Sequence, residues 1–150
     1  MQLTLFSDYS LRVLLYLTAH PGRVVPLPEI SRAYGISQNH LIKVMQLLVA
    51  EGLIESVRGR SGGVRLARDP CDINVAAVVR VTEPHLDLVE CFNSETNTCP
   101  IDTACGLKGA LLKARAAFLG ELERYTLADF VPRAPALIQL WRHQLREANP

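Results

Sequence analysis

The chain has 150 residues, 49% of them hydrophobic, and its 16 basic and 15 acidic side chains give a net charge of +1 at pH 7. This length fits one compact domain, or a small domain with an appended oligomerisation element. The near-neutral balance excludes a strong overall positive field, so any affinity for nucleic acid has to arise from local patches.

The N-terminal segment lacks the features of an export signal. It has no basic region, and Asp8 and Arg12 interrupt its apolar run. We therefore expect neither a signal peptide nor a membrane span. In the cytoplasmic, reducing environment that this predicts, clustered cysteines more often bind metal or react as thiols than form disulfides.

The first predicted element is a largely buried helix over 3–19, because leucines and other apolar residues cover most of its circumference. Asp8 and Arg12 are spaced i,i+4 on this helix. From spacing alone, the simplest interpretation of Asp8 is one half of a local ion pair.

A helix-turn-helix is predicted next. A short helix over 28–34 ends at Gly35, which suits a left-handed helix end, and Ser37 can cap a second helix that runs to about residue 50. Such a pair is either a DNA-reading motif or an ordinary helical hairpin. Near the start of the second helix, four side chains are candidates for contact with DNA: Gln38, Asn39, His40 and Lys43.

A basic hairpin that follows these helices favours a DNA-reading motif over an ordinary helical hairpin. Short β-favouring runs over 53–58 and 64–67 flank a glycine-rich tip, and a helix-turn-helix followed by such a hairpin is a winged helix. The hairpin and its end carry four arginines: Arg58, Arg60, Arg65 and Arg68. We expect Arg60 in the minor groove and Arg58 and Arg65 at phosphates. The other interpretation of the four arginines is that they are solvated on a hairpin that does not bind DNA.

Beyond the wing, Asn74 can cap a short helix through about residue 81, and a long amphipathic helix is predicted over 104–125. The long helix is a natural dimer interface, because helix-turn-helix proteins usually bind two half-sites as symmetric dimers. A weak helix over 136–146 ends the chain.

These elements predict a mostly α fold with a small β-hairpin wing, in which a winged helix-turn-helix is joined to a long dimerisation helix. The predicted divisions are a DNA-binding domain at 1–80, a cysteine-containing loop at 81–105, a dimerisation helix at 106–130 and a C-terminal tail at 131–150.

The polar segment 90–105 looks like neither helix nor strand, yet it holds three of the four cysteines, Cys91, Cys99 and Cys105. Three thiolates are one ligand short of a structural zinc site, and a four-iron cluster is also held mostly by thiolates. The residues alone leave three interpretations open. They are an iron–sulfur cluster, a zinc site completed by His85, Cys71 or an acid, and reactive thiols. We find no nucleophile–base pair and do not expect an enzyme.

The order of these motifs resembles the winged-helix iron–sulfur regulator family that includes IscR and RirA, over roughly residues 1–130. The matching features are the helix-turn-helix, an R-G-x-x-G-G wing at 58–63, Glu83-Pro84, the three-cysteine loop and the long helix. Within that family, the segments 1–12, 35–44 and 125–129 resemble the NsrR-like nitric-oxide-sensing repressors.

The resemblance implies a homodimeric repressor that binds an inverted-repeat operator in double-stranded DNA and releases it when nitric oxide attacks an iron–sulfur cluster. It implies a [4Fe-4S] cluster, with [2Fe-2S] as the alternative, whose metal ligands are Cys91, Cys99, Cys105 and, from the partner subunit, Asp8. Arg12 would help to neutralise the cluster. Lys108 stands where IscR-like members carry a histidine ligand. The alternatives are a regulator that senses iron or cluster status, and a zinc-stabilised winged-helix interaction module.

Overall fold

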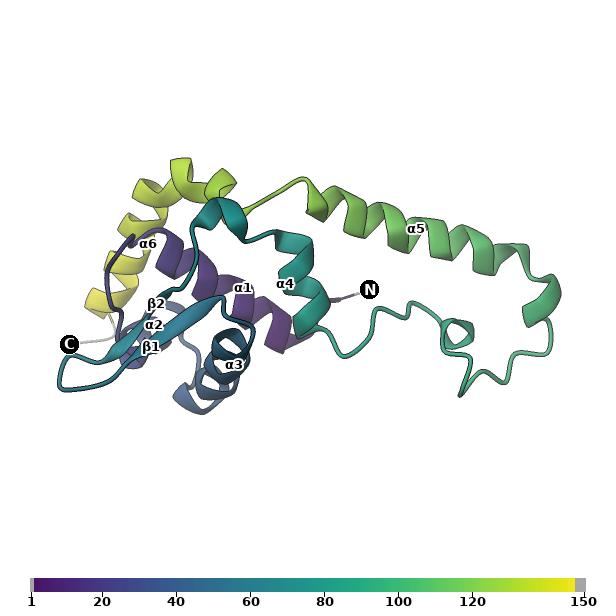
Figure 1. The fold of residues 1–150 in the computed structure, drawn as a ribbon, viewed down its shortest axis with the longest axis horizontal. Coiled ribbons are helices and arrows are strands. Elements are labelled where there is room, and N and C mark those ends of the chain that lie inside the picture. The colour runs from purple at the N-terminus through teal and green to yellow at the C-terminus, as the bar shows by residue number, and fades with distance from the viewer. Residues whose placement is uncertain (1, 148–150) are drawn as a thin grey trace.

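The structure is a computed structural model that describes residues 2–147, and it confirms the mostly α fold with a small hairpin wing (Figure 1). The helices are α1 (Leu5–Thr18), α2 (Leu27–Tyr34), α3 (Gln38–Ala50), α4 (Val75–Thr82), α5 (Gly106–Glu123) and α6 (Ala134–Glu147). The strands are β1 (Ile54–Val57) and β2 (Gly63–Leu66), and 3-10 turns cover Pro70–Asp72, Glu90–Phe92, Asp102–Ala104 and Leu127–Arg133.

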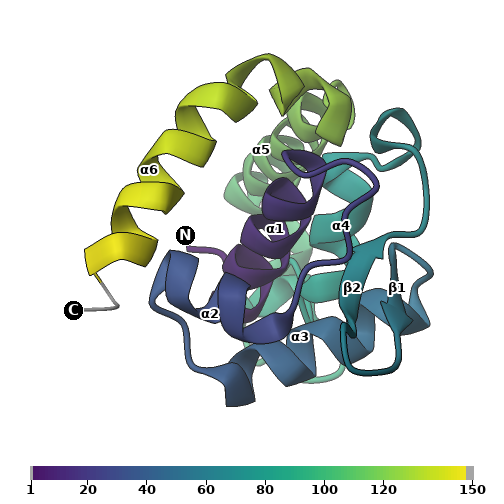
Figure 2. The same ribbon diagram turned by 90° about the vertical axis from the view of Figure 1, so that its left-hand side faces the viewer.

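Helix α1 is the centre of a head formed by α1–α4, the hairpin and α6 (Figure 2). Its residues Val13 and Leu14 are fully buried, and Tyr16 is 1% exposed. Helix α3 packs on it through Leu41 and Val44, which are also fully buried. The apolar faces of both helices thus form one core, which leaves their polar faces for other roles.

The predicted helix-turn-helix is present with the predicted end residues. Gly35 ends α2 in the left-handed conformation, with a φ of 65° that few other residues adopt at low cost. Ser37 caps α3, because its Oγ accepts the backbone N–H of His40 at 3.4 Å. The turn therefore fixes the angle at which α3 leaves α2.

The hairpin is tied to the head through its second strand. The backbones of Val25 and Val64 exchange two hydrogen bonds, of 2.8 and 2.9 Å. A Cβ added to Gly63 would lie 2.3 Å from the carbonyl oxygen of Val25, so this close approach requires glycine. The wing is thus held at a fixed position beside the helix-turn-helix.

Helix α5 projects from the head, and the segment that carries the three cysteines runs to its remote end (Figure 1). Within the described chain, α5 has no buried residue. The chain then returns to the head, where α6 lies beside α2 (Figure 2). The weak helix expected at the end of the chain is therefore a 14-residue helix docked on the head. Among residues 2–147, no helix is long and apolar enough to cross a membrane.

Candidate DNA-binding and cluster-binding sites

The start of α3 presents the four polar side chains singled out for DNA contact. Gln38, Asn39, His40 and Lys43 are all exposed, while the neighbouring Leu41 is fully buried. The ring of His40 lies 6.1 Å from that of Tyr9 in α1. Helix α3 can therefore offer hydrogen-bonding groups to a DNA groove without disturbing the core.

The wing arginines fall into two groups. Arg58 and Arg60 are exposed near the tip, and neither makes a hydrogen bond or ion pair with any residue in 2–147. Arg65 forms an ion pair with Glu55 on the facing strand, and both side chains are nearly half exposed. Because exposed pairs of this kind are weak, Arg65 can exchange Glu55 for a phosphate.

Arg68 has a different environment from the other three. Its guanidinium donates to the backbone oxygens of Glu51 and Gly52, both at 2.9 Å. These carbonyls follow the end of α3, where helices leave acceptors without intrahelical partners. Arg68 therefore supports the fold, a role that the arginine-rich pattern of the hairpin could not distinguish from DNA contact.

Asp8 and Arg12 form the expected i,i+4 ion pair on α1. The two side chains make contacts of 2.7 Å (Nη2 to Oδ2) and 3.0 Å (Nε to Oδ1), and they are 39% and 42% exposed. The hydrogen bond to Asp8 raises the pKa of Arg12. An exposed pair is worth about 0–1 kcal/mol, so the Asp8 carboxylate stays available to another partner.

Cys91, Cys99 and Cys105 are free, half-buried thiols, and Cys71 is exposed outside the loop. Among residues 2–147, no group of three or more His, Cys, Asp or Glu side chains lies close enough to hold a metal ion. A single chain therefore does not assemble the predicted ligand set. As donors, the residues still suit an iron–sulfur cluster, because three thiols with no disulfide lie within one short polar loop.

Two basic side chains of α5 hold the cysteine loop against the helix. Arg115 donates to Asp87 Oδ1 at 3.2 Å, and its guanidinium lies 4.7 Å from the centre of the Phe92 ring. Lys108 pairs with Asp102, and that contact, with smaller contributions from Cys91 and Cys105, raises the pKa of Lys108. No local sequence pattern identifies Arg115 as an anchor, since its partners lie more than 20 residues away.

Glu83 connects the start of this loop to α1. Its Oε1 accepts the N–H of Thr4 at 2.8 Å and the hydroxyl of Thr4 at 3.1 Å. Partial burial opposes ionisation, but hydrogen bonds from Ser7 and Thr4 outweigh it and lower the pKa of Glu83. The Glu83-Pro84 pair, noticed in the sequence as a motif, thus fixes the loop to the N-terminus of the helix that carries Asp8.

The chain is similar to known proteins over most of its length. The model of the Rrf2 family, described as an iron-dependent transcriptional regulator, matches residues 3–133. The HTH-type transcriptional regulator NsrR of Shouchella clausii (strain KSM-K16) is 52% identical over 132 residues, which cover 87% of this chain and 89% of that protein. NsrR of Bacillus subtilis (strain 168) is 46% identical, covering 93% and 97%. The solved structure of T. potens IscR superposes with a TM-score of 0.72 at 28% identity, covering 89% and 88%.

Proposed function

The chain belongs to the Rrf2 family of iron-dependent transcriptional regulators, which are not enzymes, and we propose that it is a nitric-oxide-sensing repressor that depends on an iron–sulfur cluster. The observation that carries the proposal is the set of three free thiols in one loop, fixed to α1 at one end and to α5 along its length. Relatives at 46–52% identity that carry the name NsrR support it.

The repressor would bind an inverted-repeat operator as a homodimer, with one α3 in each of two major-groove segments. Gln38, Asn39 and Lys43 would meet base edges, since they are exposed on the first turns of α3. Arg60 would enter the minor groove, while Arg58 and Arg65 would neutralise phosphates. The lack of any buried residue on α5 in the described chain supports a dimer, because a second α5 would cover its apolar face.

Cys91, Cys99 and Cys105 would hold the cluster, with the partner subunit's Asp8 as the fourth ligand. When bound, the cluster would supply iron atoms with which nitric oxide reacts. A [4Fe-4S] cluster suits three thiolates and one carboxylate, and [2Fe-2S] is the alternative. In Figure 1, α1 lies in the head and the loop segment 90–105 lies toward the remote end of α5, which favours a donor from a second copy.

A ligand supplied across the dimer would couple the cysteine loop to the position of the DNA-binding heads. Asp8 would leave Arg12 to become a ligand, and Arg12 would remain beside it as a counter-charge. Release of Asp8 would free one head to move against the other. A tenfold loss of operator affinity needs a difference of only about 1.4 kcal/mol between the two states.

A second candidate is a regulator that responds to iron supply or to loss of the cluster. The description of the matching family as iron-dependent favours it, and it uses the same ligands. The two candidates differ in the signal alone, so the response of the loaded protein to nitric oxide separates them.

The proposed ligand set is tested by comparing Cys99→Ser with Cys71→Ser, each isolated without oxygen and measured for visible absorption, iron and sulfide. We expect Cys99→Ser to lose the absorption and most of the iron, and Cys71→Ser to match the parent protein, because Cys71 lies outside the loop. Stoichiometric zinc and no visible absorption in the parent protein would contradict the proposal and favour a zinc-stabilised module.

A further inference from the structure

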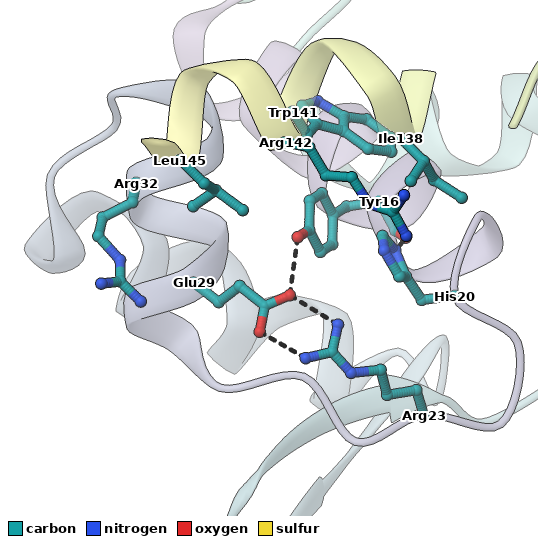
Figure 3. A pocket seen from close by; sticks show the side chains of 9 residues that line it. All are labelled: Tyr16, His20, Arg23, Glu29, Arg32, Ile138, Trp141, Arg142 and Leu145. Carbon is teal, nitrogen blue, oxygen red and sulfur yellow. Dashed lines mark hydrogen bonds and ion pairs between the residues drawn. The ribbon is translucent and has the colours of Figure 1, made fainter. Parts of the chain in front are cut away.

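A cavity of about 390 Å³ lies between α1, α2 and α6, away from the cysteine loop (Figure 3). Its size falls within the range of small-molecule sites, about 300–1,000 Å³. Helix α6 forms one wall, and α2, the first helix of the helix-turn-helix, forms another. Nothing in the proposed repressor mechanism uses this cavity.

One side of the cavity is aromatic and rigid. The ring of Tyr16 stacks on that of His20, with centroids 4.5 Å apart, and lies 4.6 Å from that of Trp141. Tyr16 and Trp141 are only 1% and 7% exposed, so packing fixes both rings. The two rings therefore form a rigid back wall of the cavity, and little of their own surface is open to a ligand.

The carboxylate in the cavity already has a positively charged partner. Glu29 accepts two hydrogen bonds of 2.7 Å from Arg23 and one of 2.8 Å from the Tyr16 hydroxyl (Figure 3). Burial opposes ionisation, but these donors outweigh it and lower the pKa of Glu29. Glu29 is therefore ionised at neutral pH and has its full charge matched by Arg23.

Two further guanidinium groups line the cavity without such a match. Arg32 comes from α2 and Arg142 from α6, and they lie on opposite sides of the Tyr16–Glu29 hydrogen bond in Figure 3. Neither has a hydrogen bond or ion pair with any residue in 2–147. Three arginines thus face one carboxylate, which leaves the cavity with excess positive charge.

We propose that this cavity binds a small organic anion, a carboxylate or a phosphate monoester, in front of the wall formed by Tyr16 and Trp141. Arg142 binds the charged group, because guanidinium groups pair well with carboxylates and phosphates, and Arg32 adds positive charge on the other side of the cavity. Such a ligand joins α6 to the first helix of the helix-turn-helix. It would act on the DNA-binding head through a route separate from the cysteines.

The single tryptophan of the chain, Trp141, lines the cavity, so its fluorescence reports binding directly. The full-length protein is titrated with benzoate, with phenyl phosphate and with neutral benzamide. We expect a saturable change with at least one of the two anions and none with benzamide over the same range. Arg142→Gln should weaken that binding about tenfold, whereas Arg146→Gln, on the same helix but outside the cavity, should leave it unchanged.

A response to benzoate alone assigns the site to carboxylates, a response to phenyl phosphate alone assigns it to phosphate monoesters, and either supports the proposal. The absence of a saturable change with both anions would overturn it, as would equal responses to benzoate and benzamide. Unchanged affinity in both Arg142→Gln and Arg32→Gln would also overturn it. Circular dichroism of the variants establishes that their helices are intact.

Discussion

Individual side chains of the same type have distinct tasks in this chain, and their partners reveal which task each one has. Arg68 is bound by two backbone oxygens and supports the end of α3, whereas Arg60 at the wing tip has no partner among residues 2–147. Holding a guanidinium unpaired in water costs little. A free arginine at a hairpin tip is therefore available for DNA at almost no cost to the fold.

Arg60→Ala should weaken operator binding by about 1–3 kcal/mol and relax sequence preference where the wing meets the DNA, because it removes a groove contact. Its melting temperature should match that of the parent protein. Fluorescence anisotropy with labelled operator at several salt concentrations measures both effects. Arg124→Ala, an exposed arginine at the end of α5, is the matched control. Unchanged affinity in Arg60→Ala would remove Arg60 from the interface.

The Glu29 carboxylate makes the stability of the head depend on pH. Its pKa is lower in the folded protein than the ordinary value of 4.5, so its stabilising contribution is complete above about pH 4.5 and is lost as the pH falls through the folded pKa. Glu29→Gln should lower the free energy of unfolding at neutral pH by about 1 kcal/mol, and the difference should shrink in acid.

Urea unfolding of Glu29→Gln at a series of pH values measures this dependence. Glu55→Gln is the control, because Glu55 also pairs with an arginine but lies half exposed on the wing. It should change the free energy of unfolding by less than about 1 kcal/mol at every pH. A loss in Glu29→Gln that stays constant into acid would show that the charge of Glu29 does not stabilise the fold.

At the scale of elements, the sequence predicted best what depends on near neighbours. In the structure Gly35 ends α2, and Ser37 and Asn74 cap the starts of α3 and α4, as predicted. Each of these helix ends depends only on residues within a few positions. The docking of α6 was not predicted beyond a weak terminal helix. It depends on Trp141 meeting Tyr16, which is 125 positions earlier, and no local pattern encodes such a contact.

The candidate cluster site could be predicted as a set of donors but not as an arrangement in space. Spacing identifies thiols in one loop, and the structure places all three half buried. The ligand roles of the three cysteines and Asp8 stay predictions, because one chain does not gather them. The contacts that hold the loop, from Arg115 and Glu83, join segments far apart in the sequence.

Arg115→Gln should loosen the cysteine loop without unfolding the head, because it removes the contacts with Asp87 and Phe92. We expect faster hydrogen exchange over 86–92 and faster loss of visible absorption from the cluster-loaded protein. Lys113→Gln is the control, since Lys113 is exposed on the same helix. If exchange over 86–92 were equally fast in the parent protein and in both variants, Arg115 would not anchor the loop.

At the scale of the whole molecule, α5 and its loop form an arm that a single chain leaves largely uncovered. Leu107 on this helix is 66% exposed, and Ile101 just before it is 60% exposed. Apolar surface of this kind usually marks an interface. A dimer through α5 would cover it and bring each cysteine loop within reach of a second head.

Leu107→Glu should therefore shift the protein from dimer to monomer, because it places a charge in the proposed interface. The fold of each chain should survive, since the side chain is already exposed. Sedimentation velocity over a range of concentrations measures the mass. Lys113→Glu, a charge change on the same helix, should remain dimeric. A Leu107→Glu protein that stays dimeric would place the dimer interface elsewhere.

We propose above that nitric oxide acts on the cluster-loaded protein to release operator DNA. We would titrate the anaerobically isolated, cluster-loaded protein with nitric oxide while recording visible absorption and operator binding on the same sample. We expect both to change together, with operator affinity falling at least about tenfold, which corresponds to about 1.4 kcal/mol. Operator binding that persists after the absorption has changed completely would contradict it.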